Sequence, residues 1–181
     1  SEITVVGGQS DTTSPTLHSF ETSQNTVDIS QGDANVYFDA VVSDDLSGFR
    51  SGHFNWISPS GSTFLDGSFW PSANEDIVEN ISTDGDKYYF ENIVVNVEQF
   101  TESGIYSLYS ISLYDEINNS SYWGRDKLQE LGLSSEITVI NIPTFRFEDS
   151  IYLQLEPSTW EDAQSNAEKL GGNLVSINSQ E

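Results

Sequence analysis

The chain has 181 residues, enough for one domain of ordinary size and part of another. Its 29 acidic and 6 basic residues give a formal charge of -23, which argues against a surface that binds nucleic acid or anionic lipid. No cysteine is present, so disulfides and thiolate metal sites are excluded. No apolar run approaches the ~20 residues of a membrane-spanning helix. We therefore expect no nucleic-acid partner and no membrane insertion, and cations or neutral ligands stay possible.

A short repeat frames the first three quarters of the sequence. Residues 1–6 (SEITVV) recur almost intact at residues 135–140 (SEITVI), and a Gly-Gly linker follows the first copy. Such self-similarity indicates a tandem array. Residues 1–10 are therefore interpreted as the last strand of a preceding repeat plus a linker, and we expect the chain to be a piece of a longer protein.

Residues 11–141 read as an antiparallel β-sandwich, because short alternating segments are separated by turn residues throughout. The predicted strands are 16–22, 26–30, 34–43, 49–58, 62–70, 76–82, 87–97, 104–115 and 135–140. Two sets of residues are each expected to share one strand face: Val36, Phe38, Ala40 and Val42 in one strand, and Ile105, Tyr109, Ile111 and Leu113 in another. One short helix is predicted at 124–131, with Leu128 and Leu131 as its buried side and Gly132 just after its end. The fold class is all-β.

Residues 142–181 predict a small α+β fragment made of a hairpin, a helix and a strand. The hairpin is expected at 145–154, and Ser158 or Thr159 can cap a helix that two glycines end at 171–172. Residues 173–178 read as the strand. Four apolar residues at helical spacing are expected to be core residues: Trp160, Ala163, Ala167 and Leu170.

Acidic residues concentrate in three segments that a sandwich can bring to one pole. They are the entry at Asp11, the loop at Asp44 and Asp45, and the loop that starts at Asp115. Calcium takes six to eight oxygen ligands from carboxylates, amides and backbone carbonyls. The proposed ligand set is Asp11, Asp44, Asp45, the carbonyl near Leu46, Asp115, and Asn118 or Asn119. The alternative is a solvated turn with ordinary Asx-turn hydrogen bonds.

The same segments resemble the immunoglobulin-like or cadherin-like modules of large bacterial surface adhesins. The matching motifs are DTTSP at residues 11–15, SDDLSG at 43–48 and YDEINN at 114–119. The resemblance covers about residues 11–140 and implies an immunoglobulin-like, calcium-stiffened spacer domain. The sequence departs from it at Ile117 and Asn118, where those modules have Ala-Gly, so either Asn118 or Asn119 would occupy the ligand position.

The segment 158–177 (STWEDAQSNAEKLGGNLVSI) is similar to the opening of a C-type lectin-like domain. That resemblance covers residues 145–181 and implies a truncated lectin-like segment, with Ala167 where a Cys often stands. The sugar and calcium ligands of such domains lie in their second half, so no sugar-binding residue is assigned here.

Together these patterns predict a non-catalytic, calcium-stabilised spacer or adhesion module of a bacterial protein, extracellular and either on the cell surface or secreted. It would contact neighbouring domains of the same polypeptide, and cell-surface glycans through the lectin-like domain. The alternative is a carbohydrate-binding accessory module of a secreted glycan-degrading enzyme, which would use exposed aromatic residues in place of a metal. Trp56, Trp70 and Trp123 are the tryptophans considered for that role, with core packing favoured. An enzyme in its own right is not expected.

Overall fold

The computed structural model describes residues 10–133, 135–142, 144–147, 150–153 and 158–175. The chain separates into two compact units, residues 1–141 and residues 142–181. Residues 1–6, interpreted above as the end of a preceding repeat, lie outside the described residues.

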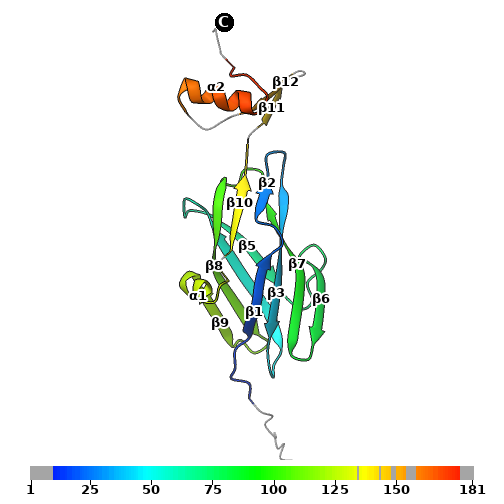
Figure 1. Ribbon diagram of the computed structural model, residues 1–181. Helices are drawn as coiled ribbons and strands as arrows, with labels where there is room; N and C mark the ends of the chain where they lie inside the picture. Colours follow the sequence, from blue (N-terminus) through cyan, green and yellow to red (C-terminus); the bar gives the residue numbers. More distant parts are fainter. Residues whose placement is uncertain (1–9, 134, 143, 148–149, 154–157, 176–181) are drawn as a thin grey trace, which may run out of the picture. The chain divides into compact units, whose positions relative to one another are not determined.

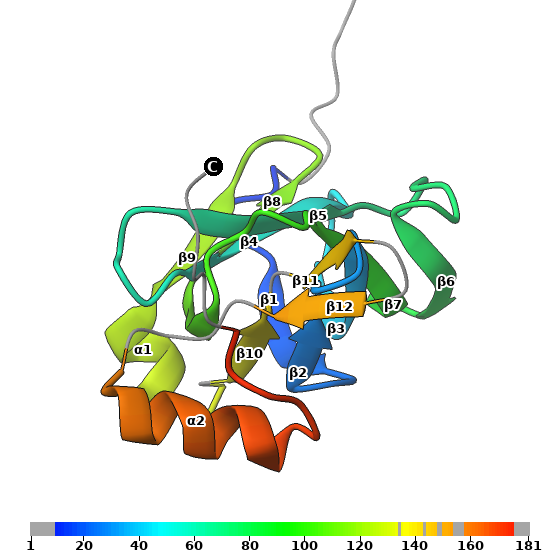
Figure 2. The same cartoon turned by 90° about the horizontal axis from the view of Figure 1, so that it is seen from above.

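The first unit is a two-layer β-sandwich, seen from the side in Figure 1 and from above in Figure 2. One layer, sheet A, has the strand order β1-β3-β7-β6. Its strands are β1 (Thr16–Thr22), β3 (Ala34–Ser43), β7 (Lys87–Val97) and β6 (Val78–Asp84). All of its neighbours pair antiparallel.

The other layer, sheet B, has the order β2-β10-β8-β4-β5, with β9 also paired to β8. Its strands are β2 (Thr26–Asp28), β10 (Glu136–Ile140), β8 (Gly104–Asp115), β4 (Phe49–Ile57), β5 (Phe64–Phe69) and β9 (Ser120–Gly124). Only β2 and β10 pair in parallel; the other pairs are antiparallel. The predicted all-β sandwich is confirmed.

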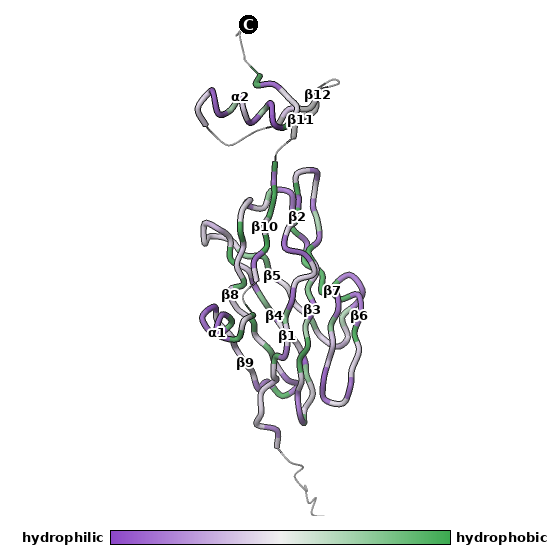
Figure 3. Tube along the Cα trace, in the orientation of Figure 1, coloured by the Kyte–Doolittle hydropathy of each residue, from purple (hydrophilic) through white to green (hydrophobic). Residues whose placement is uncertain are grey.

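The core lies between the two sheets and is built from alternate residues of each strand, as the two-residue period of a strand requires. Val36, Phe38, Ala40 and Val42 are at most 1% exposed, so their predicted shared face is confirmed. Burying side chains of this kind contributes roughly 1.5–3 kcal/mol each. Figure 3 shows hydrophobic stretches along the strands, whereas the turn between β6 and β7 is hydrophilic.

Two glycines of sheet B let aromatic rings cross the neighbouring strand. A Cβ on Gly52 would lie 2.2 Å from the ring of Phe69, and a Cβ on Gly67 would lie 2.1 Å from the ring of Phe54. Both rings are almost fully buried. The glycines therefore make room for the largest side chains of this part of the core.

The predicted shared face of Ile105, Tyr109, Ile111 and Leu113 is wrong. Ile111 and Leu113 are fully buried, but Ile105 and Tyr109 are 52% and 40% exposed. The register between β4 and β8 shifts between Asn55 and Trp56, so that Trp56 faces Leu108 while Asn55 faces Ser110. This β-bulge adds one residue to β8 and reverses which side chains face the core.

The segment after β8 also differs from expectation. Residues 120–124 form β9, which the turn-rich sequence did not predict, and helix α1 (Arg125–Glu130) follows directly. Leu128 is buried as predicted, but Leu131 is 49% exposed because it is the C-cap residue, beyond the helix's inward side. Gly132 has a φ of +70°, which suits the residue after a helix C-cap.

The chain enters and leaves the sandwich at opposite ends. The start of β1 lies beside the end of β3, and the start of β4 lies beside the end of β8. The end of β10 lies beside the start of β8, at the opposite pole. The chain therefore enters the sandwich at one pole and leaves it at the other (Figure 1).

The second unit contains a hairpin of β11 (Thr144–Phe147) and β12 (Ser150–Leu153), and helix α2 (Trp160–Lys169). Thr159 caps α2, because its side chain accepts a hydrogen bond from the backbone N–H of Asp162. Gly171, with a φ of +77°, follows the end of the helix.

The prediction that four apolar residues of α2 are core residues is wrong for two of them. Ala167 is buried and Ala163 is half-buried, but Trp160 and Leu170, at the two ends of the helix, are 70% and 54% exposed. Residues 173–175 are not in a strand, and residues 176–178 lie outside the described residues. No helix among the described residues is long and apolar enough to cross a membrane.

Candidate metal centre

Three acidic segments meet at the entry pole of the sandwich. Asp11 belongs to the segment that leads into β1, Asp44 and Asp45 to the β3–β4 loop, and Asp115 to the end of β8. Strand pairing causes this meeting, because β1, β3, β4 and β8 all begin or end at this pole. Of the described residues, only Asp11, Asp44 and Asp45 form a group of three possible metal ligands, with one oxygen from each within 4.8 Å of the others.

Asp11 is held in place by donors from its own segment and from the β3–β4 loop. One oxygen accepts the backbone N–H of Thr13 (2.9 Å), an Asx turn, and the other accepts the backbone N–H of Ser47 (2.9 Å). The carboxylate is 8% exposed. These donors, the N–H of Thr13 first, lower the pKa of Asp11 to about 2.

Asp44 has fewer partners than a buried carboxylate needs. Its Oδ2 accepts the backbone N–H of Gly48 (2.7 Å) and lies 3.4 Å from the Ser47 hydroxyl. Its Oδ1 is buried with no hydrogen-bond partner, and the residue is 6% exposed. Burial raises the pKa of Asp44, and the negative charges of Asp11 and Asp115 add to this effect.

Asp45 is exposed and connects to the group through Thr13. The Thr13 hydroxyl lies 2.8 Å from Oδ1 of Asp11 and also within hydrogen-bonding distance of Oδ1 of Asp45. A hydroxyl has one proton, so it can donate to only one of these two carboxylates at a time. The group therefore holds more acceptors than donors.

No basic side chain balances the group. Among the described residues the only ion pair is Lys127–Glu130, on helix α1. Two like charges at such separations repel by roughly 3 kcal/mol near a protein surface. Three carboxylates, one orphaned oxygen and a shortage of donors together suit a bound cation.

Asp115 is fully buried and organises the β8–β9 loop. Its Oδ1 accepts the backbone N–H groups of Ile117 (3.0 Å) and Asn119 (2.7 Å), and its Oδ2 accepts the side-chain amide of Asn119 (2.7 Å). Asp115 is not one of the three grouped ligands; its charge acts on Asp44 from the next segment. It positions Asn119 beside the group.

The two asparagines of this loop have different surroundings. The side-chain amide of Asn119 also lies 3.5 Å from the backbone carbonyl oxygen of Asp11, so Asn119 adjoins the acidic group. The Oδ1 of Asn118 accepts a hydrogen bond from Nη1 of Arg50 (2.6 Å). Asn118 has a φ of +74°, a left-handed conformation that turns the loop. Of the two, the geometry favours Asn119 as a further ligand.

Leu46 lies in the β3–β4 loop between the grouped aspartates and the donors, with its side chain 53% exposed. Its carbonyl was proposed as a ligand, and the neighbouring N–H groups of Ser47 and Gly48 fix the loop on which that carbonyl lies. Sequence reasoning missed the roles of Thr13, Ser47 and Gly48. A signal was available only for Thr13, because an Asp side chain favours an Asx turn with the backbone N–H two residues on; no such local spacing marks the Ser47 bond to Asp11 or the Gly48 bond to Asp44.

Calcium fits this donor set better than a transition metal. The three grouped carboxylates, and the amide and carbonyls predicted to join them, all offer hard oxygens, and a calcium ion 2.3–2.6 Å from each ligand holds oxygens up to roughly 5 Å apart. The 4.8 Å limit on the three aspartates agrees with that span.

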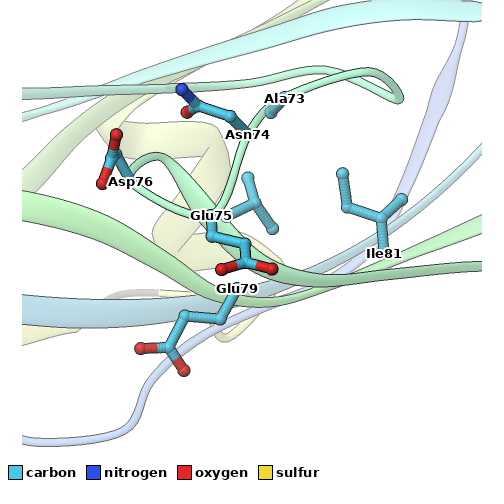
Figure 4. Close-up of a pocket in the computed structure, with 7 residues that line it drawn as sticks. Ala73, Asn74, Glu75, Asp76, Glu79 and Ile81 are labelled. Carbon is cyan, nitrogen blue, oxygen red and sulfur yellow. The ribbon is translucent and has the colours of Figure 1, made fainter.

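A second acidic region lies away from this pole. A hollow of about 570 Å³ is lined by the segment before β6 and by β6 itself, and Figure 4 shows the carboxylates of Glu75, Asp76 and Glu79 around it. All three side chains are exposed. Glu79 accepts a hydrogen bond from the amide of Asn92 (2.6 Å). These acids are solvated and are not grouped as metal ligands.

Comparison with known proteins places the chain in a family. No curated protein matches it. A family model described as a domain of unknown function (DUF7035) matches residues 10–153, which include the whole sandwich and both strands of the hairpin. Because the match covers most of the chain, the protein belongs to the DUF7035 family.

Proposed function

We propose that the sandwich is a calcium-stabilised, non-catalytic structural module of an extracellular surface protein. One observation carries this proposal: Asp11 and Asp44, both buried, come together with the exposed Asp45, no cationic partner lies among the described residues, and Oδ1 of Asp44 has no hydrogen bond. A divalent cation would supply the missing partner and remove the repulsion among the carboxylates.

Calcium would act by stabilising the folded state. An ion that binds only the folded protein adds about 2.7 kcal/mol to the free energy of unfolding at a hundredfold excess over its Kd. Its ligands would join the segment before β1 to the β3–β4 and β8–β9 loops. The metal would thus stiffen the point at which the chain enters the module.

The positions of the two chain ends support a spacer. The chain enters at the pole that carries the acidic group and leaves through β10 at the opposite pole. Modules with this geometry can be joined end to end without folding back. The net charge of -23 favours solubility and repulsion between neighbouring molecules.

The second unit is proposed to be the start of a lectin-like domain that the sandwich presents to glycans. The hairpin followed by the Thr159-capped helix and its glycine end supports that proposal.

Calcium binding is tested by isothermal titration calorimetry on chelator-treated protein. The wild type is expected to show saturable binding, and Asp44→Asn is expected to weaken it by more than about tenfold, because a charged ligand is lost. Asp76→Asn, in the exposed hollow, is the matched control and keeps wild-type binding. Wild-type protein that releases or takes up no heat beyond dilution, at millimolar calcium, would refute the proposal.

A further inference from the structure

The outer face of sheet B differs from the rest of the surface. This face is made by residues of β4, β5 and β8 whose side chains point away from the core. It is called the aromatic face here and consists of Ser51, His53, Asn55, Ile57, Phe64, Asp66, Ser68, Ser107, Tyr109, Ser112 and Tyr114.

Charge is almost absent from the aromatic face, although the chain has 29 acids. Asp66, on β5, is its one carboxylate. On the outer face of sheet A, Glu21 faces Asp39 directly across β1 and β3, and the backbone N–H of Asn92, next to Glu91 on β7, donates to Asp39. The two faces come from the same acidic sequence, so the low charge of the aromatic face suits a neutral ligand better than a cationic one.

Exposed rings lie in two groups along the aromatic face. Phe64 and Tyr109 are 45% and 40% exposed and meet edge to face with centroids 5.6 Å apart. Further along, the rings of His53 and Tyr114 are 5.9 Å apart. Phe64 pairs with Ile57, and Tyr114 pairs with Ser51. Ile57 and Ser51 are six residues apart on β4, so the face extends roughly 20 Å along the strand.

Between the rings lie neutral groups that donate and accept hydrogen bonds. Asn55 uses Oδ1 to accept the Ser110 hydroxyl (2.8 Å), which leaves its amide N–H groups without a partner among the described residues. Asp66 is the cross-strand neighbour of Asn55. His53 uses Nδ1 toward the Ser68 hydroxyl (2.9 Å), which leaves Nε2 free, and burial lowers its pKa, so the imidazole stays neutral.

The bulge in β8 places the Tyr109 ring on this surface. Without the extra residue between Leu108 and Ile111, strand alternation would not place Tyr109 and Ser112 on the same side as Asn55 and His53. Bulges cost ladder hydrogen bonds and often re-aim a side chain toward a ligand. Two of the three tryptophans considered earlier do not contribute, since Trp56 is fully buried and Trp123 packs against the core; Trp70, just after β5, is half-buried.

We propose that the aromatic face of sheet B binds a neutral, extended oligosaccharide chain. A sugar ring has one face of C–H groups that packs on aromatic rings, and hydroxyls around its edge that both donate and accept hydrogen bonds. Rings at both ends of the face, with the Asn55 amide, the Asp66 carboxylate and the His53 imidazole between them, match both features. A second copy of this chain, or a nucleic acid, would bring negative charge against a face that contains no Lys or Arg. The cation beside it is Arg50, which lies 5.6 Å from the centroid of the Tyr114 ring and is hydrogen-bonded to Asn118.

The test is affinity electrophoresis of the full chain, with calcium present, in native gels that contain one neutral polysaccharide each: mixed-linkage β-glucan, xylan, galactomannan or α-glucan. The wild type is expected to be retarded in at least one gel. Tyr109→Ala and Phe64→Ala are each expected to weaken that binding about tenfold, as for truncation of a central aromatic contact.

The matched control is Tyr37→Ala, a half-buried aromatic on the outer face of sheet A, which should bind like the wild type. Circular dichroism checks that each variant is folded. Three results would overturn the proposal: no retardation in any of the gels, equal losses in Tyr37→Ala and Tyr109→Ala, or sedimentation that shows self-association of the wild type abolished by Tyr109→Ala. The outcome does not depend on calcium binding, because no residue of the acidic group lies on this face.

Discussion

The acidic group at the entry pole and the acids of the hollow beside β6 contain the same chemistry in different surroundings. Asp11 and Asp44 are at most 8% exposed, and an oxygen from each lies within 4.8 Å of an Asp45 oxygen. Glu75 and Asp76 are exposed to solvent. Water screens the second set, so its charges interact weakly, whereas the first set needs donors or a cation.

Burial and unmet hydrogen bonds, more than acid content, distinguish a candidate metal site. A chain with a net charge of -23 carries many neighbouring acids that water alone can accommodate. Among the residues that the structure describes, Oδ1 of Asp44 at the entry pole is the only buried carboxylate oxygen without a partner. Substitutions in either region test this difference.

The largest effect is expected from Asp115→Ala, which breaks the loop that supports the acidic group. Three N–H donors, from the backbones of Ile117 and Asn119 and the side chain of Asn119, would lose their acceptor at a fully buried site. We expect the free energy of unfolding to fall by about 3 kcal/mol or more in calcium-depleted protein, measured by urea denaturation.

Asp115→Asn is the control, since its amide oxygen can still accept the two backbone N–H groups, and it should lose less stability than the alanine variant. Equal stability of Asp115→Ala and the wild type without calcium would show that these hydrogen bonds do not hold the pole together.

The effect of Asp44→Asn on the free energy of unfolding should change sign between calcium-depleted and calcium-saturated protein. In calcium-depleted protein it removes a buried charge whose pKa burial has raised, so we expect equal or higher stability than the wild type. At a hundredfold excess of calcium over the wild-type Kd the metal adds about 2.7 kcal/mol to the wild type, and a tenfold weaker Kd removes about 1.3 kcal/mol of this, so the variant becomes the less stable protein. Thermal melts in the two buffers measure this reversal. A variant that is less stable by the same amount in both buffers would favour a solvated turn.

The pH dependence of the calcium-depleted protein should reveal the two opposite shifts. The pKa of Asp44 is raised above its unfolded value of 3.8, so its contribution makes the free energy of unfolding fall as pH rises through that value toward the folded pKa. The pKa of Asp11 is lowered to about 2, so its stabilisation is present above 3.8 and is lost as pH falls toward 2. Urea denaturation at a series of acidic pH values measures both effects. In Asp44→Asn the fall in unfolding free energy attributed to Asp44 should disappear. If that fall is unchanged in the variant, another group causes it.

The smallest effect is expected in the hollow. Asp76→Asn removes an exposed acid with no grouped partner, so we expect a change within about 0.5 kcal/mol, with or without calcium. The same thermal melts measure it. A calcium-dependent loss in this variant as large as that in Asp44→Asn would erase the distinction between the two regions.

Strand alternation predicted most of the sandwich, because burial of one face imposes a two-residue period that is visible in the sequence. Strands β1, β3, β7 and β8 have the predicted bounds. Alternation could not predict the bulge at Tyr109, which depends on pairing between β8 and a distant strand. It also missed β9, whose Ser-Ser-Tyr sequence is polar because only Trp123 of that strand packs against the core.

The acidic residues of the candidate site were predicted by their places at strand ends, but their individual environments were not. The sequence could not show which of Asn118 and Asn119 is the better ligand candidate. The Arg50 side chain that donates a hydrogen bond to Oδ1 of Asn118 comes from another strand. Nor could it predict that Asp115 is saturated with hydrogen bonds while Asp44 has an unpaired oxygen. Those differences arise from the backbone N–H groups that each loop presents.

The most direct test is the thermal midpoint of the wild-type protein in millimolar calcium and in excess chelator. We expect calcium to raise the Tm by roughly 5–10 °C, the shift that corresponds to about 2.7 kcal/mol in a protein of this size, and the chelator to reverse it. Magnesium at the same concentration should give a smaller shift, because it demands a tighter octahedral site. An identical Tm in calcium and chelator would contradict the proposal that the acidic group holds a metal.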